Sequence, residues 1–403
     1  GGESYSTGSL VKYDPADYTL NTPFRLSGFT FDLGDMCHGL AIGEESKSAP
    51  FTIQDHVRID HNRWTNVSTR TLQAIWNYGV AYGVVDHNQF NVPYPIRNSP
   101  QIQNYSWWAY PPQNIFIPGG NTTLYYEDNV FTNVTGQTDT CLTDGQFGAR
   151  YAFRYNTITI DKPSYSLFDL HGHQGDPMMP GSFGVEVYGN LVNASSMPVW
   201  LVSVRSGKSF VFNNDVETTG GLYNKAYAGS TASCPSDYIN EQLTNNTYFW
   251  GSRKNKTGTL AGFSITDQLA GPCGGLVNIP TGGRDVFWDG ETPSTPGITS
   301  GSLSSLPATC TVGQGYWATN QSTTDLTGMV GANPTTPISG TLYKCTSTDK
   351  WEEYYTPYTY PHPLIAYFDA PPIRSAGSPS GSQSAGTTQV TLSLTTNKNA
   401  TCK

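Results

Sequence analysis

The segment Val57-Arg-Ile59-Asp-His-Asn62-Arg-Trp64 sets the pattern on which the fold depends. Two apolar residues flank one other residue, two polar residues follow, and an Asn then precedes a further apolar position. The same order returns in five later segments, the last of them weaker: 83–90, 124–131, 151–158, 185–192 and 210–216. The Asn residues of the six copies are Asn62, Asn88, Asn129, Asn156, Asn190 and Asn214, so that they are separated by 26, 41, 27, 34 and 24 residues.

A base period near 25 residues, built from short alternating strands, is typical of a solenoid. Alternation within each copy places one set of side chains inside the coil. The Asn falls where each strand bends, and Asn residues stacked on one another would bind backbone groups that the bend leaves unpaired. The alternative is an immunoglobulin-like sandwich in which the repeated Asn is a coincidence.

The run from about Phe29 to Gly220 resembles secreted right-handed parallel β-helix proteins of the pectin-lyase-like group. Its segments Val57–His61 and Val84–His87 are similar to a strand motif of pectate lyases. The segments 309–319, 342–346 and 355–363 resemble the C-terminal part of uncharacterised bacterial β-helix proteins. The resemblance implies the fold and leaves the activity open, because β-helices host lyases, hydrolases, adhesins and fibre proteins.

We therefore expect an all-β chain, a right-handed parallel β-helix (solenoid) with a small disulfide-stapled C-terminal module and a terminal strand. Residues 1–50 would form an N-terminal cap and first strands, and residues 51–300 the β-helix with long loops. Residues 301–372 would form an aromatic-rich module stapled by cysteines. Residues 373–403 combine a Ser/Gly-rich linker with an alternating strand at Val390–Leu394.

The composition bears on compartment and partners. Charged residues make up 13% and the net charge is -9, which argues against a nucleic-acid partner. No apolar run reaches the roughly 18 residues of a membrane span. A start without Met indicates a processed end, and we expect a secreted, extracellular or cell-surface glycoprotein. The Asn-x-Ser/Thr sequons that permit N-linked glycans are Asn66, Asn104, Asn121, Asn133, Asn193, Asn245, Asn255, Asn320 and Asn399.

The cysteines are widely spaced and suit disulfides better than zinc. Cys310 and Cys345 are expected to form a disulfide within the C-terminal module. Cys234 and Cys273 lie in the loop-rich region, and Cys37 and Cys402 lie near the two ends. Because the count of 7 is odd, one thiol stays free or pairs with another chain.

Two sets of polar residues are candidates for a binding or metal site. Stacked rungs would align Asp60, Asp86, Glu127, Arg154 and Tyr188 in one outward column. Such a column could bind Ca²⁺ or a uronic-acid polymer, or it could be a solvated outer face. The cluster Asp169-Leu-His171-Gly-His173 has ligand types that suit Zn²⁺ or another divalent metal, or it could be a polar patch of hydrogen-bonded histidines.

For catalysis the candidates are Asp169, Arg154 and Lys208, with Arg205 near Lys208 in a turn that could supply a lyase base. No adjacent Asp-Asp pair occurs, so the sequence identifies no glycosidase pair of carboxylates. The aromatic residues Trp107, Trp108, Tyr354 and Tyr358 could stack on sugar rings, although aromatic side chains more often pack between loops and coil.

These observations favour an extracellular structural protein that assembles into a fibre or surface layer. The terminal strand could join a neighbouring subunit, and a Cys402–Cys37 bond would link subunits head to tail. The alternatives are a polysaccharide lyase or hydrolase that acts on an acidic glycan and a glycan-binding adhesin. The sequence contains no complete catalytic set that decides between them.

Overall fold

The computed structural model describes the residues 9–13, 23–34, 38–43, 53–67, 73–78, 80–92, 95–98, 117–134, 142–145, 148–160, 166–171, 181–195, 197–227, 244–266, 280–290, 292–369, 374–378 and 393–396. The described chain divides into two compact units, residues 1–358 and residues 359–403. No helix among the described residues is long and apolar enough to cross a membrane.

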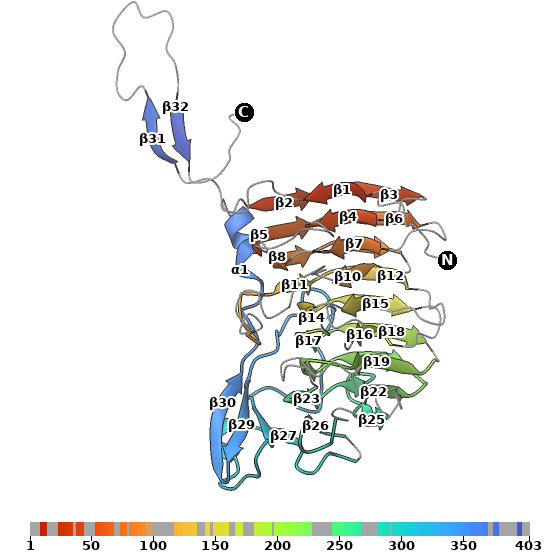
Figure 1. The fold of residues 1–403 in the computed structure, drawn as a ribbon, viewed down its shortest axis with the longest axis vertical. Helices are drawn as coiled ribbons and strands as arrows, with labels where there is room; N and C mark the ends of the chain where they lie inside the picture. The colour runs from red at the N-terminus through yellow and green to blue at the C-terminus, as the bar shows by residue number, and fades with distance from the viewer. Residues whose placement is uncertain are drawn as a thin grey trace, which may run out of the picture. The chain divides into compact units, whose positions relative to one another are not determined.

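The first unit is a parallel β-helix, which confirms the predicted fold class. Three parallel sheets run along the coil (Figure 1), and each described rung contributes one strand to each sheet, except the last, which contributes none to sheet C. Sheet A contains β1 (Ser9–Tyr13), β4 (His38–Ile42), β7 (Gln73–Asn77), β10 (Ile96–Asn98), β13 (Thr143–Gly145), β16 (Phe168–Leu170), β19 (Val199–Val204), β22 (Leu222–Tyr227) and β25 (Gly262–Thr266).

Sheet B follows sheet A around the rung. It contains β2 (Phe24–Ser27), β5 (Ile53–Asp60), β8 (Val80–Asp86), β11 (Leu124–Glu127), β14 (Arg150–Arg154), β17 (Gly184–Tyr188), β20 (Lys208–Phe212), β23 (Thr247–Trp250) and β26 (Val286–Trp288). Sheet C contains β3 (Thr30–Gly34), β6 (Arg63–Val67), β9 (Gln89–Asn91), β12 (Val130–Val134), β15 (Thr157–Ile160), β18 (Leu191–Ser195), β21 (Asp215–Thr218) and β24 (Arg253–Lys254).

The predicted Asn ladder lies at the bend between sheets B and C. Asn156 shows the repeating pattern: its Oδ1 accepts from the backbone N–H and the Nδ2 of Asn129, and its own Nδ2 donates to the Tyr126 carbonyl at 2.9 Å. The same contacts run from Asn62 to Asn214, where the Ser252 hydroxyl takes over. The ladder thus pairs the backbone groups that each bend removes from the sheets.

The residue before each ladder Asn has a left-handed backbone. It is His61, His87, Asp128, Tyr155, Gly189 or Asn213, with φ between 46° and 65°. Such values are uncommon outside glycine, so the bend depends on the ladder bonds to hold it. Gly189 is required for a second reason, since a Cβ there would lie 2.7 Å from the Tyr155 ring.

The core is the inside of the coil, where aromatic rings stack from rung to rung along sheet C. Phe31 lies 4.2 Å from Trp64 between ring centroids, and Phe90 lies 4.7 Å from Phe131. Buried aliphatic residues of the three sheets fill the remaining interior. Burial of these side chains, each contributing about 1.5–3 kcal/mol, is the main force that holds the rungs together.

A C-terminal module extends the first unit. It comprises the mixed sheet of β27 (Ile298–Gly301), β28 (Gly315–Ala318), β29 (Thr341–Ser347) and β30 (Lys350–Tyr355), with a 3₁₀ turn at Leu303–Ser305. The Cys310–Cys345 disulfide joins it internally, as predicted. The module packs on sheet B: Trp317 lies 5.3 Å from Phe212 and 5.1 Å from Trp250 between ring centroids.

The second unit contains a short helix and a hairpin. They are α1 (Pro363–Asp369) and the antiparallel pair β31 (Arg374–Ser378) and β32 (Ser393–Thr396). A terminal strand therefore exists at Ser393–Thr396, overlapping the predicted Val390–Leu394 at residues 393–394, and it pairs within its own chain; residues 390–392 lie outside the described residues. Cys37, Cys234, Cys273 and Cys402 lie outside the described residues, so their predicted bonds stay predictions.

Candidate functional site

The predicted polar column exists in register on sheet B, but it is buried. Asp60 pairs with Asp86 across the ladder, Asp86 with Glu127, and Glu127 with Arg154. All four residues and Tyr188 have no exposed surface. As the alternation along the strand predicts, these side chains point away from the inside of the coil. The expectation that this face is open to solvent is wrong for them.

Each carboxylate of the column is paired with an arginine. Arg25 donates two hydrogen bonds to Asp60, at 2.8 and 2.7 Å, and Arg58 donates two to Asp86, both at 3.0 Å. Burial opposes ionisation of Asp60, but the hydrogen bonds from Arg25, His61 and Ser27 outweigh it and lower the pKa. Carboxylates already neutralised in this way are poor ligands for Ca²⁺ or partners for a polymer.

Arg154 belongs to the same buried network. Its Nε donates to Glu127 at 2.7 Å, and its Nη1 donates to the Tyr188 hydroxyl at 2.9 Å and to the Tyr358 carbonyl at 2.6 Å. A guanidinium enclosed in this way cannot reach a polysaccharide, so the structure argues against Arg154 as a catalytic base. Lys208, the other predicted base, starts β20 on sheet B, on the far side of the Ser206–Gly207 bend from Arg205.

A second column, on the outer face of sheet A, gathers the strongest candidate site. Arg97, Asp144, Asp169, Ser203 and Lys225 are register partners on consecutive rungs. Their neighbours along the strands, such as Leu170 and Val204, point into the core. The column therefore brings two carboxylates together between cationic residues.

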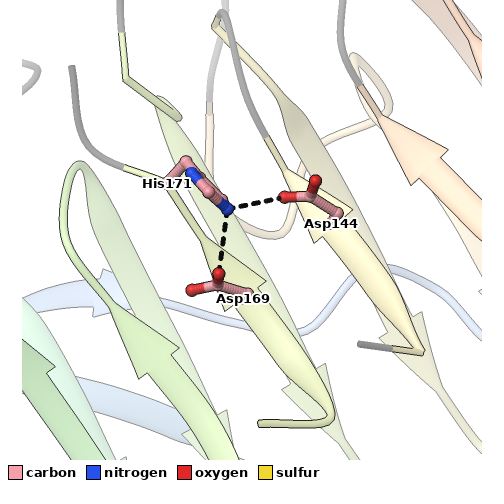
Figure 2. Close-up of side chains that lie close together, drawn as sticks. All are labelled: Asp144, Asp169 and His171. Carbon is pink, nitrogen blue, oxygen red and sulfur yellow. Dashed lines mark ion pairs between the residues drawn. The ribbon is translucent and has the colours of Figure 1, made fainter. Parts of the chain in front are cut away.

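His171 joins the two carboxylates. Its Nε2 lies 2.9 Å from Asp169 Oδ2 and 3.2 Å from Asp144 Oδ1, as Figure 2 shows. The backbone of His171 is fixed by its neighbours, because its N–H donates to the Gly145 carbonyl at 2.8 Å and its carbonyl accepts from the Ser206 hydroxyl at 2.6 Å. The main chain that carries the imidazole is thus bonded to the rungs on both sides.

Two arginines complete the site. Arg205, which follows β19, donates from Nη2 to Asp169 Oδ2 and lies 3.2 Å from His171 Nε2. Arg97 Nε lies 3.7 Å from Asp144 Oδ2. The other oxygen of Asp169, Oδ1, is buried and accepts no hydrogen bond from any described residue.

The two carboxyl groups differ in how readily they ionise. Burial raises the pKa of Asp144, against the opposing charges of His171 and Arg97. Burial also acts on Asp169, but the hydrogen bond from His171 and the charge of Arg205 outweigh it and lower the pKa. A pair whose environments separate the two pKa values is the arrangement that acid–base catalysis uses.

The same residues could hold a metal ion. One ligand atom from each of Asp144, Asp169 and His171 lies within 4.8 Å of the others. Arg205 already contacts two of these atoms and supplies positive charge, which favours an acid–base role over a metal role. His173, the third predicted metal ligand, lies outside the described residues, as do Trp107 and Trp108.

Asp144 is the residue that the sequence analysis missed. It stands 25 residues before Asp169, the base period of the repeat, and this spacing was the signal that could have found it. Asp169 and His171 were predicted and do lie in the site. Arg205 was noted in the sequence only as a possible lyase base.

The predicted sugar-stacking tyrosines lie in packed positions. Tyr354 lies against Phe210 and Tyr248, at 5.9 Å from each between ring centroids, and Tyr358 lies 5.2 Å from Tyr125. Among the predicted glycosylation sites, Asn121, Asn255 and Asn320 are exposed, whereas Asn193 and Asn245 are partly buried. Nothing is described for the side chains of Asn66, Asn104, Asn133 and Asn399.

Comparisons with family models, with curated proteins and with solved structures give no match for this chain. The resemblance to the pectin-lyase-like group therefore stays a prediction, and the function has to be argued from the site itself.

Proposed function

We propose that this chain hydrolyses glycosidic bonds of an acidic polysaccharide at the site formed by Asp144, Asp169 and His171. The observation that carries the proposal is the pair of aspartates on neighbouring rungs of sheet A that share the Nε2 of one histidine. Glycoside hydrolysis uses two such carboxyl groups, and here the Asp144 side chain is 24% exposed and that of Asp169 is 5% exposed.

The roles follow from the surroundings of each carboxyl group. Asp144 has the raised pKa and would donate a proton to the leaving glycosidic oxygen. Asp169 has the lowered pKa and would face the positive charge that develops at the anomeric carbon. Arg205 and His171 position Asp169 through Oδ2, which leaves Oδ1 without a bond in the described chain.

The proximity of the groups favours a two-step reaction. One oxygen of Asp144 and one of Asp169 lie within 4.8 Å of each other, and both contact Nε2 of His171. The carboxyl groups of retaining enzymes lie closer together, at roughly 5–5.5 Å, than the roughly 6.5–9.5 Å of inverting enzymes. In the first step, the bond between the anomeric carbon and the leaving oxygen breaks, Asp144 gives its proton to that oxygen, and Asp169 forms a glycosyl ester. In the second step, water cleaves the ester and returns the proton to Asp144.

An acidic substrate is favoured by the cations beside the carboxylates. Arg97 lies in the same column and Arg205 lies next to Asp169, and their side chains are 25% and 24% exposed, whereas Lys225 of the column is buried. Arginine and lysine on one face attract a polymer that carries carboxylates. The net charge of -9 makes this local concentration of positive charge more distinctive.

The test is the release of reducing ends from polygalacturonate, alginate and a neutral β-glucan by the purified chain. Asp144→Asn and Asp169→Asn should each lower the rate by about 10²-fold or more. Glu352→Gln, an exposed site on β30, serves as the control with unchanged activity. Products that absorb as unsaturated uronates, activity lost on chelation and restored by a divalent cation, or no cleavage of any polymer would each overturn the proposal.

The prediction of a self-assembling structural protein stays open beside this one. The described strand β32 pairs with β31 of its own chain, which differs from the predicted joining of a neighbouring subunit. Cys37 and Cys402 lie outside the described residues, so no observation bears on a disulfide between subunits.

A further inference from the structure

A pocket of about 440 Å³ lies on the same sheet as the carboxylate pair, toward the C-terminal end of the coil. Residues of β19, β22 and β25, together with the segment after β26, line it. These strands follow β16 along sheet A, as their labels show in Figure 1. The volume falls within the roughly 300–1,000 Å³ that small-ligand sites have.

Two pairs of aromatic rings form the walls. Trp200 and Tyr223 lie 4.9 Å apart between ring centroids, and Phe263 and Trp288 lie 4.5 Å apart in a stacked arrangement. Tyr223 has 40% of its surface exposed, which is unusual for a large ring beside a hollow. Aromatic faces of this kind are suited to the apolar C–H face of a sugar ring.

Glycines keep the hollow open. Gly221 and Gly262 both line the pocket, and a Cβ at Gly262 would lie 3.1 Å from the Tyr223 ring. A Cβ at Gly221 would lie 2.3 Å from the same side chain. Side chains at these positions would therefore displace Tyr223, so the absence of a side chain preserves the shape of the pocket.

Polar groups accompany the rings. Asp289 and Lys254 line the pocket, and Ser264 lies on its edge strand. Asp289 Oδ2 accepts a hydrogen bond from the Gly251 N–H at 2.8 Å, which fixes the carboxyl group, and burial raises its pKa to about 6. A few fixed polar groups among aromatic walls are the usual composition of a site that binds a polyhydroxylated ligand.

The pocket lies on neighbouring strands of the sheet that carries the carboxylate pair. Asp169 on β16 is the register partner of Ser203 on β19, which in turn partners Lys225 on β22. Lys225 Nζ lies 5.0 Å from the Trp200 ring centroid, so it connects the column to the pocket wall. Trp200, the residue of β19 that lines the pocket, stands three residues before Ser203, so the pocket begins about 11 Å from Asp169 when strands are about 4.8 Å apart and residues about 3.3 Å apart along a strand.

We propose that this pocket is a sugar-binding subsite for an acidic polysaccharide chain that runs along the axis of the coil over sheet A. One sugar ring packs on Tyr223 and Trp200, and Arg97 and Arg205, whose side chains are 25% and 24% exposed, contact carboxylates of the units that lead toward Asp144 and Asp169. This inference rests on the proposed function, since it assigns a substrate path to the same site.

The test measures binding apart from cleavage. Polygalacturonate and a neutral β-glucan are titrated into the Asp169→Asn chain, with and without a second change at Tyr223. Tyr223→Ala should weaken polygalacturonate binding about tenfold, because the stacking face is lost. Tyr223→Phe keeps the ring and should bind nearly as the parent does. Unchanged binding in Tyr223→Ala, or equal binding of both polymers, would overturn the subsite.

Kinetics separate this inference from the proposed hydrolysis. In the otherwise native chain, Tyr223→Ala should raise KM for the polymer about tenfold. If the Tyr223→Ala chain cleaves the polymer with the native KM, the proposed hydrolysis stands and the proposed subsite is wrong. If the native chain never cleaves the polymer but its polymer binding depends on Tyr223, the subsite stands and the proposed hydrolysis is wrong.

Discussion

The hydroxyl of Tyr355 donates a 2.6 Å hydrogen bond to the buried carboxylate of Glu186, which precedes it by 169 residues. The second oxygen of Glu186 accepts from the Gly119 N–H at 2.7 Å. Tyr355 also stacks on Phe210 at 4.4 Å between ring centroids. One phenol thus fastens the C-terminal module to the outer face of sheet B.

Tyr355→Phe should destabilise the chain by about 1–3 kcal/mol, because it keeps the ring and leaves a buried acceptor with one donor. Burial raises the pKa of Glu186, and the Tyr355 hydrogen bond opposes that rise. The raised pKa means that the neutral carboxyl of Glu186 stabilises the fold fully below the pKa that it has in the unfolded chain. This contribution is lost as the pH rises through its higher pKa in the folded chain. Urea unfolding should show a larger deficit for the variant at about pH 8 than at about pH 4.

Glu186→Gln is the matched control, since its amide cannot ionise. In this background, the deficit caused by Tyr355→Phe should be the same at both pH values. A deficit that grows with pH even without the carboxyl group would show that another group is responsible.

Asn156→Ala should cost about 3–5 kcal/mol, because it removes an interior member of the Asn ladder and leaves several buried groups unpaired. Its Nδ2 donates to Tyr126 and Arg154, and its Oδ1 accepts from Asn129. Thermal unfolding of this variant can be compared with that of Asn214→Ser, at the rung beside the natural Ser252. The Ser variant should lose less, and equal losses would contradict the ladder as the source of stability.

The ladder was predictable from the sequence for a local reason. Asn is the side chain that can donate and accept at a bend with a left-handed residue before it, so Asn62 to Asn214 recur at the rung period. The burial of Asp60, Asp86 and Glu127 was not predictable in this way. It depends on pairing with Arg25 and Arg58 on neighbouring rungs and on a network that reaches Tyr358, far along the chain.

The candidate site was half predictable. Asp169 lies on β16 and His171 directly follows its end, and the spacing of two residues alone predicts that they share a face. Asp144 comes from the preceding rung on a strand of three residues, too short for a pattern of its own. Only the assignment of strands to sheet A reveals that Asp144 and Asp169 are register partners.

If subunits link head to tail through Cys402 and Cys37, non-reducing gel electrophoresis of the purified chain should show a ladder of multimers that reductant collapses. Cys402→Ser should abolish the ladder, and Cys310→Ser should not, because Cys310 is bonded to Cys345. Electron microscopy of the same samples should show filaments only for chains with Cys402. A monomer under non-reducing conditions would contradict the prediction.

Protonated His87 should stabilise the contact between the coil and the C-terminal module. Its Nδ1 lies 2.9 Å from Asp86 and its Nε2 3.0 Å from Asn333 Oδ1. The hydrogen bond to Asp86 raises the pKa of His87 to about 9, and Asp128 adds to the effect. His61, stacked 5.2 Å away, is the neighbouring imidazole that faces it.

Because the folded pKa lies above the ordinary value near 6.5, this stability is full below about pH 6.5 and is lost as pH rises to about 9. The loss should amount to about 1–3 kcal/mol. His87→Gln keeps hydrogen-bonding atoms and cannot take up a proton, so it should lack this part of the pH dependence. Parallel thermal midpoints for the native chain and the variant across that window would refute the assignment.

The proposed catalytic pair predicts a bell-shaped dependence of kcat/KM on pH. Activity should fall at low pH as Asp169 becomes protonated, at a pH lowered by His171 and Arg205 despite burial. It should fall at high pH as Asp144 loses its proton, above its ordinary range because burial raises the pKa. Because the two carboxyl groups interact, the acidic and alkaline limbs of the pH profile report the pair as a whole. Substitution of each aspartate shows which residue is responsible for which limb.

Substrates with different leaving groups show which aspartate is the proton donor. Asp144→Asn should abolish cleavage of the polymer but spare an aryl glycoside whose leaving group needs no proton, and the alkaline limb should disappear with that substrate. Asp169→Asn should lose both activities by about 10²-fold or more, because no leaving group replaces the missing carboxylate. Equal losses on both substrates in the Asp144 variant would remove Asp144 as the proton donor. They would point instead to a role of the pair in holding His171 in place.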